Sequence, residues 1–595
     1  MCRSALLLAA CLACPIAAPS HAQTGKSPAA GSVASEQALD ALFVDEWERG
    51  LRDSPENASY NGDTRYDDRW TDFSLAAIAA REAADRAALG RLHAIDRAAL
   101  SPAAQLNYDT FEWLQQRSVA RQKFREYLQP IDHQGGPQTA DGIVEVMPFA
   151  TYADYRNWLK RMAALPAFID QVIALMQEGV KTGHVSPRVL MDRVPAQITA
   201  QIVDDPTMSA FYRPFLKFDD GVPDAARALL QAEAQKTIRD MVVPAYRKLK
   251  AYFIEEYLPR TRHSIAATDR PDGKAYYDFL TRFYTTTDLS VDEIHAIGLK
   301  EVARIRTVME KVMAETGFSG TLGEFFTYLR TDPKFFHKTP DELLNAYRAV
   351  AKRIDPELVK VFKTIPRLPY GVRAIPDNIA ADTTTAYYQG GAIDGTRPGY
   401  YYVNLHKPEV RPTWEMMPLS LHEAVPGHHF QFARALELPD APMFRRTAYF
   451  VAYGEGWGLY AEQLGYDMGL YENPYDRFGQ LTYEMWRAVR LVVDTGIHAK
   501  GWSRKRAIEY FKANAAKTDQ DIVNEIDRYI GTPAQALAYK IGEMKISELR
   551  ARAKRELGSK FDLREYNDAV LATGSVPLTA LEVRIERWIE ERKGR

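Results

Sequence analysis

Apolar side chains recur every three or four residues along most of this chain, which is the spacing of one face of an α-helix. One such face consists of Leu165, Phe168, Ile169, Val172 and Met176. Comparable stretches cover about residues 76–118, 224–257, 291–317, 341–363 and 503–516. The helix that carries the first face should have Pro166 near its first turn and Gly179 past its end. The pattern therefore predicts a mainly α-helical protein.

One segment has the composition of a β-strand instead. Pro398 and Gly399 precede an aromatic and β-branched run that extends from Tyr400 to Leu405, as expected for a strand that follows a turn. Upstream, the stretch from Asp382 to Gly391 is predicted to be a loop. We expect a small β-sheet here, in which Tyr400–Asn404 would pair with an extended peptide through backbone hydrogen bonds.

The first 22 residues have the layout of a secretory signal peptide. Arg3 precedes an apolar run from Ala5 to Cys14, and Ser20 and Ala22 are the small residues expected before a cleavage site. The apolar run is too short to cross a bilayer, which takes about 20 residues. We therefore expect cleavage near Ala22 and a periplasmic or secreted protein without a transmembrane segment.

The N-terminal region also allows a second processing route, and a short segment predicted to be flexible comes after it. Residues 8–11 (Leu-Ala-Ala-Cys) resemble a lipobox, which would leave a lipoprotein acylated at Cys11, although the apolar stretch before this cysteine is unusually short. Residues 23–36 are rich in Ser, Ala, Gly and Thr, and this composition predicts a flexible lead.

The amino-acid composition limits which residues of the mature chain could bind a metal ion. All three cysteines, Cys2, Cys11 and Cys14, lie in the predicted signal peptide, so the mature chain would have neither disulfides nor cysteine ligands. A metal ion would have to be held by histidines and carboxylates. The net charge is −2 with both signs well mixed, which gives no indication of a nucleic acid or an anionic membrane as a partner.

The motif that carries chemistry occupies residues 421–429, Leu-His-Glu-Ala-Val-Pro-Gly-His-His. A zinc peptidase helix usually has the pattern H-E-x-x-H, in which two histidines one turn apart bind the metal and the glutamate is the general base. Here His422 and Glu423 fit the beginning of that pattern, but the position of the second histidine is occupied by Pro426. The second candidate ligand is therefore His428 or His429.

Regular helix geometry allows neither pair to chelate a metal. His422 and His428 would lie on opposing faces, about 600° apart, and His422 and His429 would be ~10 Å apart along the axis. Pro426, however, disrupts a helix because it lacks an N–H and clashes with the carbonyl four residues earlier. We expect a kink or widened turn that brings His428 to the metal, with His429 as the alternative.

Two later segments supply further candidate residues. Glu455, within Gly-Glu-Gly, is the best third ligand, because its flanking glycines would let its backbone approach the first helix closely. Glu462, two turns later, would either support a ligand or lie on a solvated face.

Arg490, Asp494 and His498 share one helix face, either with Asp494 orienting the imidazole of His498 or as a structural ion-pair ladder. His498 and Tyr539 are candidate catalytic hydrogen-bond donors to an oxyanion.

These segments together resemble the DUF885 family, a large and mostly bacterial group grouped with gluzincin-type zinc peptidases. The resemblance extends from about Ala38 to Trp588 and rests on residues 422–429, 455–462, 490–498, 539–542 and 574–578. It implies a large helical metallopeptidase-like fold of the oligopeptidase or carboxypeptidase kind, with two lobes around a channel. One unit at 37–595 would comprise a helical lobe at about 37–370 and a catalytic part at about 371–595.

The resemblance also implies roles for individual residues. His422, His428 and Glu455 would bind Zn²⁺, and Glu423 would be the general base. Where relatives tend to have Phe-His-Asp, this chain has Tyr-Asn-Asp at 566–568, so a role for a histidine there is excluded.

The function predicted from the sequence is zinc-dependent hydrolysis of peptide bonds, with a peptide as substrate. Zinc would polarise the scissile carbonyl, and Glu423 would take a proton from water and pass it to the leaving amine. Two alternatives remain at this point: a hydrolase of non-peptide amides, and a non-catalytic protein that binds peptide or metal. The presence of Glu423 favours catalysis, because metal binding alone does not require the base.

Overall fold

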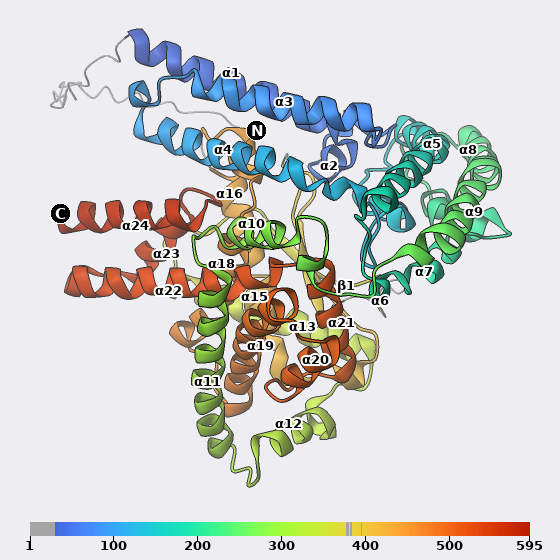
Figure 1. Cartoon of the computed structure of the whole chain (residues 1–595). Coiled ribbons are helices and arrows are strands. Elements are labelled where there is room, and N and C mark those ends of the chain that lie inside the picture. Colours follow the sequence, from blue (N-terminus) through green and yellow to red (C-terminus); the bar gives the residue numbers. More distant parts are fainter. Residues whose placement is uncertain (1–29, 377–379, 381–383, 394, 439, 595) are drawn as a thin grey trace, which may run out of the picture.

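The computed structural model describes residues 30–376, 380, 384–393, 395–438 and 440–594, and it is mainly α-helical, as predicted (Figure 1). The N-terminal helices are α1 (Ala30–Asp53), α2 (Pro55–Tyr60), α3 (Leu75–His93) and α4 (Pro102–Arg121), followed by α5 (Tyr152–Thr182), α6 (Arg188–Met191), α7 (Val194–Ala200), α8 (Asp224–Thr237) and α9 (Val243–Tyr252). The central helices are α10 (Gly273–Thr285), α11 (Val291–Glu315), α12 (Leu322–Thr331) and α13 (Pro340–Ile354).

The C-terminal helices form the rest of the molecule. They are α15 (Met416–Glu423), α16 (His428–Leu436), α17 (Met443–Thr447), α18 (Val451–Met468), α19 (Pro474–Ala499), α20 (Arg504–Lys512), α21 (Asp519–Gly531), α22 (Ala538–Leu557), α23 (Leu563–Leu571) and α24 (Leu578–Lys593). Two groups of helices with similar axis directions are visible in Figure 1. One consists of α1, α3 and α4 along the top, and the other of α22 and α24 below them on the left. Between and below these groups, α15, α18 and α19 lie near the centre of the molecule.

The chain is helical earlier than the sequence predicted. Helix α1 begins at Ala30, so residues 30–36 of the predicted flexible lead are helical. The physical reason is that Leu39, Leu42 and Phe43 of α1 are buried against α3 and α4, and the Ala- and Glu-containing residues before them extend the same helix. The predicted signal peptide at 1–22 and Cys11 lie outside the described residues.

Helix α5 differs from the prediction at both ends. It begins after Thr151, whose side chain caps it, so Pro166 lies inside the helix rather than in its first turn. Gly179 is buried within the helix, and Gly183 ends it with a left-handed φ of 75°. The predicted helix was too short because Tyr155 and Trp158 continue its buried face toward the N-terminus.

The small predicted sheet is present beside the motif, but its arrangement excludes the predicted pairing with a peptide. Strand β3 (Gly399–Val403) is central, parallel to β1 (Tyr370–Ala374) and antiparallel to β2 (Ala386–Gln389). Because both edges of β3 are already hydrogen-bonded, Tyr400–Asn404 cannot add a substrate strand. Strand β2 also corrects the loop predicted for Asp382–Gly391. The sheet packs against α15 and α16.

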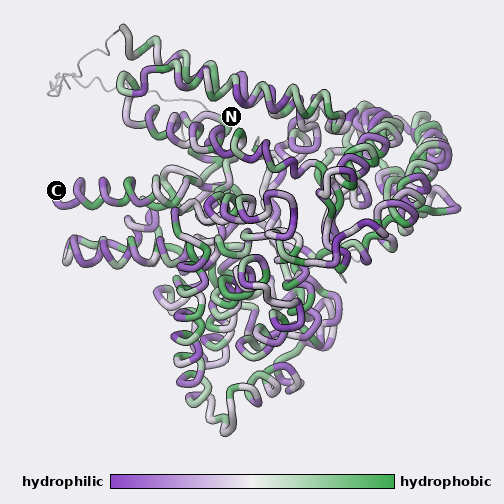
Figure 2. The backbone as a smooth tube through the Cα atoms, in the orientation of Figure 1, coloured by the Kyte–Doolittle hydropathy of each residue, from purple (hydrophilic) through white to green (hydrophobic). Residues whose placement is uncertain are grey.

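The buried core consists of two large hydrophobic clusters, and each contains residues from both sides of position 370. Helix α11 packs along α19, and α18 packs along α22. Hydrophobic and hydrophilic positions alternate along the outer helices, as Figure 2 shows for α1, α3 and α24. Helices from the first 370 residues therefore support the segments that carry the motif. In the part of the chain that is described, none of the helices has the length and apolarity needed to cross a bilayer.

Candidate metal centre

The Pro-Gly pair breaks the motif helix completely. Helix α15 ends at Glu423 and α16 begins at His428, with non-helical backbone at Ala424 and Gly427. A Cβ on Gly427 would lie 1.8 Å from the carbonyl oxygen of His422, so only glycine fits at this close approach. The indole N–H of Trp457 on α18 donates a 2.8 Å hydrogen bond to the carbonyl of Pro426. The predicted distortion is thus a four-residue connection between two helices.

This connection brings His422 and His428 together with Glu455. The Nε2 atoms of His422 and His428 lie 3.4 Å and 3.3 Å from the same carboxylate oxygen of Glu455. The two imidazole rings are nearly perpendicular, with centroids 4.7 Å apart. All three donor atoms lie within 4.8 Å of one another. Residues from three helices, α15, α16 and α18, therefore converge on one point.

The donor set fits a metal ion of the size of zinc. Ligands at adjacent corners of a zinc tetrahedron, each about 2.0–2.1 Å from the ion, are about 3.3–3.4 Å apart. Both His–Glu distances have this value. Two imidazoles and one carboxylate are also the protein ligands of one class of catalytic zinc sites, in which the fourth position stays open. His422, His428 and Glu455 are therefore the residues that can hold a metal.

Electrostatic interactions within the cluster are strong because it is buried. Burial lowers the pKa of His422, but its contacts with Glu455 and Glu462 outweigh that effect and raise the pKa to about 9. Burial raises the pKa of Glu455, whereas the charge of His428 and the contacts with both imidazoles bring it well below the usual value. Glu455 is thus a carboxylate that lies next to the imidazole rings of His422 and His428.

Glu462 supports His422 from the side away from Glu455. Its Oε1 atom lies 2.8 Å from Nδ1 of His422, and its side chain is completely buried. The alternative of a solvated helix face is therefore wrong. A carboxylate on the second nitrogen orients the ring and directs Nε2 toward Glu455, as is usual for metal-binding histidines. Nη2 of Arg487 on α19 lies 3.6 Å from the same oxygen of Glu462.

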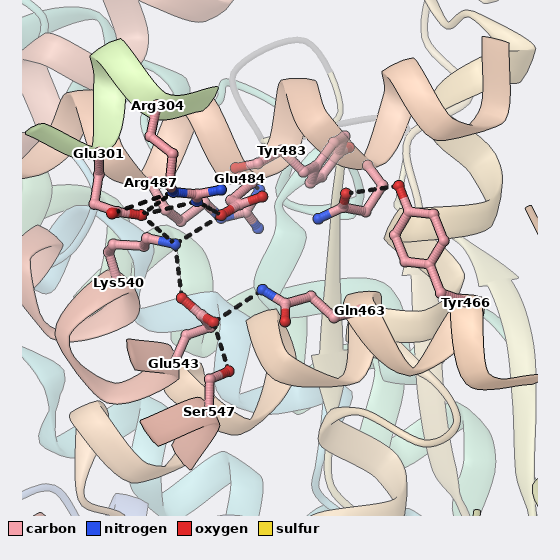
Figure 3. A network of polar contacts seen from close by, with 11 residues as sticks. Glu301, Arg304, Gln463, Tyr466, Tyr483, Glu484, Arg487, Lys540, Glu543 and Ser547 are labelled. Atoms are coloured by element: carbon pink, nitrogen blue, oxygen red, sulfur yellow. Dashed lines mark hydrogen bonds and ion pairs between the residues drawn. The ribbon is translucent and has the colours of Figure 1, made fainter. Parts of the chain in front are cut away.

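A buried polar network includes Gln463, the residue that follows Glu462 (Figure 3). The ammonium of Lys540 on α22 contacts three carboxylates, Glu301 at 3.2 Å, Glu484 at 2.8 Å and Glu543 at 2.7 Å. Gln463, next to Glu462, donates a 2.8 Å hydrogen bond to Glu543. The network joins α11, α18, α19 and α22, and this constrains the helices that position the cluster.

Three glycines around Glu455 make room for three different neighbours. A Cβ on Gly458 would lie 2.7 Å from Cε1 of His422, so the close approach to the motif helix is at Gly458 and not at the predicted glycines that flank Glu455. Gly456 instead faces Gly542 of α22, where the Cβ would be 2.5 Å from the carbonyl carbon. Gly454 accommodates the ring of Tyr449. The glycine-rich segment therefore packs against two helices and an aromatic ring.

The structure separates the two candidate second ligands. The ring nitrogens of His429 interact with the hydroxyl of Tyr388 and with the carbonyl oxygen of Leu368, both at 3.0 Å. Burial lowers the pKa of His429 to about 4. With both nitrogens engaged away from Glu455, His429 is a structural residue, and His428 is the one brought to the cluster.

This separation gives a direct prediction. His428→Ala should remove most of the bound zinc, because it deletes one of three donor groups, whereas His429→Ala should keep the zinc and lower the thermal stability. Elemental analysis and thermal unfolding of both purified variants provide the measurement. Full zinc retention in His428→Ala would contradict the assignment.

Glu423 is placed beside the cluster rather than in it. Its side chain is 9% exposed, and within the described residues its carboxylate has no hydrogen-bond or ion-pair partner. Burial, followed by the charge of Glu455, raises the pKa of Tyr449 well above its usual value, and the charge of Glu423 adds to the rise. Glu423 and Glu455 therefore both lie near Tyr449. A carboxylate free of other partners is available to take up a proton.

Tyr449 also lies near Glu455 and Glu423, although no motif in the sequence singles it out. Its ring stacks on Phe432 with centroids 5.4 Å apart, and its hydroxyl stays protonated near Glu455 and Glu423. Despite these contacts, Tyr449 is 37% exposed. The glycine at position 454 was the available indication, since it leaves the space that this ring fills.

His498 does not lie at the cluster. Its Nδ1 accepts a 2.9 Å hydrogen bond from the backbone N–H of Ala267, and Nε2 lies 2.9 Å from the carbonyl oxygen of Tyr529. Burial lowers its pKa to about 4. Both nitrogens are therefore used by the backbone, and the predicted role as an oxyanion donor is wrong.

Asp494 and Arg490 also differ from the prediction. Asp494 accepts hydrogen bonds from the hydroxyl of Tyr277 at 2.6 Å and the N–H of Ala534 at 3.1 Å, and it does not orient His498. Burial raises its pKa to about 7. The shared helix face carries no ion-pair ladder, because the partner of Arg490 is Glu525 at 3.0 Å.

Tyr539, by contrast, is close to the cluster. Burial and then the charge of Glu455 raise its pKa, and the charges of Arg528 and Arg490 oppose the rise. The guanidinium of Arg490 lies 4.3 Å from the centre of its ring. Tyr539, with a protonated hydroxyl, thus lies near Glu455 and near both arginines.

Fold and site together define a mainly helical protein with a buried His-His-Glu cluster at a break in its motif helix. The chain belongs to the DUF885 family, described as bacterial proteins of unknown function, whose model matches residues 55–585. Among curated proteins, none matches this chain.

Two solved structures are similar over nearly the whole chain. A candidate lipoprotein from Colwellia psychrerythraea is 28% identical, with a TM-score of 0.89, and the match covers 94% of this chain and 99% of that one. A candidate lipoprotein of unknown function from Shewanella oneidensis is 18% identical, with a TM-score of 0.67, and the match covers 93% and 99%. The second likeness concerns the fold alone.

Proposed function

We propose that this protein is a zinc-dependent hydrolase of peptide bonds. The observation that carries the proposal is the position of His422 and His428, each at the tetrahedral ligand spacing from one oxygen of Glu455. The unpartnered carboxylate of Glu423 next to this cluster favours hydrolysis over metal binding alone. A bound zinc ion would supply Lewis-acid activation of water and of the substrate carbonyl.

The residues of the chain have distinct tasks in this proposal. Glu462 holds the ring of His422 so that Nε2 points into the site. Glu423 takes a proton from the attacking water and returns it to the leaving amine, because its carboxylate has no competing partner. The hydroxyls of Tyr449 and Tyr539 are protonated donors close to Glu455, suited to stabilise a developing oxyanion.

A digest of a peptide library tests this function. The full-length protein should cleave peptides when loaded with zinc and stop after chelation, and mass spectrometry of the products identifies the bonds. Restoring activity with added zinc is the control for damage by the chelator. Cleavage only of non-peptide amides would favour the broader amide hydrolase, and binding of peptides without cleavage would favour a binding protein.

The proposal places the protein outside the cytoplasm. The signal-like segment before Gln23 and the similarity to the candidate lipoprotein from Colwellia psychrerythraea both support export. We expect the mature N-terminus at Gln23, because the apolar stretch before Cys11 is unusually short. Intact-mass measurement and N-terminal sequencing of protein from the native host check this. Recovery of a diacylated Cys11 would contradict it in favour of a membrane-anchored lipoprotein.

A further inference from the structure

The cluster has a closed side and an accessible side. His422 is 2% exposed and Glu462 is fully buried, whereas Glu455 is 13% exposed and the nearby Tyr449 is 37% exposed. Tyr539 lies near Tyr449 but is itself only 9% exposed. Solvent, and therefore a substrate, reaches Glu455 from the side of Tyr449.

A close helix approach places Tyr539 on this side. At Gly456 of α18 and Gly542 of α22 the two backbones nearly touch, since a Cβ on Gly456 would be 2.5 Å from the carbonyl carbon of Gly542. Glu455 precedes the first glycine by one residue, and Tyr539 precedes the second by less than one helical turn. Because the two helices are so close here, the residues that pack against Tyr539 also lie toward the cluster.

Two arginines behind Tyr539 share a single carboxylate. Nη2 of Arg490 and Nη2 of Arg528 lie 3.0 Å and 3.1 Å from the same oxygen of Glu525. Tyr529 donates a 2.5 Å hydrogen bond to that oxygen as well. Among the described residues, Glu525 is thus the ion-pair partner of both arginines, in a largely buried region where charge interactions are strong.

The two arginines differ in their exposure and in the hydrogen-bond partners of their remaining nitrogen atoms. Arg490 is 4% exposed, and its Nη1 atom has no hydrogen-bond partner among the described residues. Arg528 is 19% exposed, and its Nη1 donates a 2.9 Å hydrogen bond to the side-chain oxygen of Gln535. Gln535 also lies close enough to the Tyr539 hydroxyl to interact with it. Arg528 and Gln535 are therefore partly exposed donors beside the buried Tyr539.

We propose that Arg528, Gln535 and Tyr539, backed by Arg490, form a subsite for a carboxylate of the peptide substrate. The proposal rests on the peptidase function proposed above and adds the substrate class, a peptide that carries a carboxylate beside the scissile bond. That carboxylate is either the C-terminus or an acidic side chain. Arginine pairs with carboxylates in a planar, two-bond geometry, which makes it the residue suited to this recognition.

Binding measurements test the subsite without relying on turnover. Calorimetry with the zinc-loaded full-length Glu423→Gln variant compares N-acetyl tetra-alanine as the free acid, the same peptide as a C-terminal amide, and an amide that ends in glutamate. The free acid should bind about 10–100-fold more tightly than the alanine amide, as expected for charge-assisted hydrogen bonds. If the glutamate amide binds as tightly as the free acid, the subsite accepts a side-chain carboxylate as well as a C-terminal one.

The preference should depend on Arg528. Arg528→Gln in the same background should bind acid and amide alike, Arg528→Lys should keep part of the difference, and the exposed Arg348→Gln is the matched control. Equal binding of acid and amide by the starting protein, or binding of neither, overturns the subsite. The parental protein is assayed in parallel with both peptides, and cleavage of both at the same rate leaves the hydrolase proposal intact while removing the subsite. A clear acid preference without any cleavage removes the hydrolase proposal alone.

Discussion

Exchange of Glu423 for glutamine is expected to slow peptide hydrolysis by about 10²–10⁴-fold, the usual contribution of general-base catalysis. Glutamine has nearly the same size as glutamate but cannot accept the proton. The zinc content should stay at the parental value, because Glu423 lies beside His422, His428 and Glu455 rather than among them. The measurement combines kcat with elemental analysis of the same sample.

A matched exchange isolates the effect of the position. Glu472→Gln removes a carboxylate from the exposed connection between α18 and α19 and should leave both kcat and zinc unchanged. Turnover at the parental rate in Glu423→Gln would mean that another group accepts the proton, and the proposed mechanism would then be wrong.

The largest loss of metal is expected on removal of the His422 imidazole. The parental protein should carry about one zinc ion per chain, and His422→Ala should lose most of it, since two donor groups cannot hold zinc as three do. Glu455→Gln should weaken the metal in the same way. Glu462→Gln leaves all three donors but loosens His422, and the expected loss in zinc affinity is about 10–100-fold.

His498→Ala is the control for this series. It removes a buried histidine whose ring nitrogens bind only backbone groups, those of Ala267 and Tyr529. The variant should keep its zinc, while the free energy of unfolding falls by about 2–6 kcal/mol because two buried polar groups lose their partners. Full zinc occupancy in His422→Ala, or zinc loss in His498→Ala, would show that the metal lies elsewhere.

The difference between His422 and His498 shows how far sequence reasoning reaches in this protein. Both histidines follow helical spacing beside a carboxylate, and both looked suited to catalysis. Only the packing of the turn at Ala267, before α10, and of α21 around His498 decides that its two nitrogens bind the backbone. The spacing of residues in the sequence shows which side chains share a face of one helix. The hydrogen-bond partner of a ring nitrogen, however, depends on which neighbouring element packs against it.

The sequence by itself determined the helical class and the break at Pro426-Gly427, because helix periodicity and proline sterics are local properties, and it singled out Glu455 as a candidate ligand. The tertiary structure decided between His428 and His429, since the direction of the chain after a break depends on contacts such as Trp457 with Pro426. It also decided that β3 lies between two strands, and that Arg490 and Arg528 share Glu525. Strand order and charge balance depend on segments far apart in the sequence, so neither can be inferred from any single stretch of it.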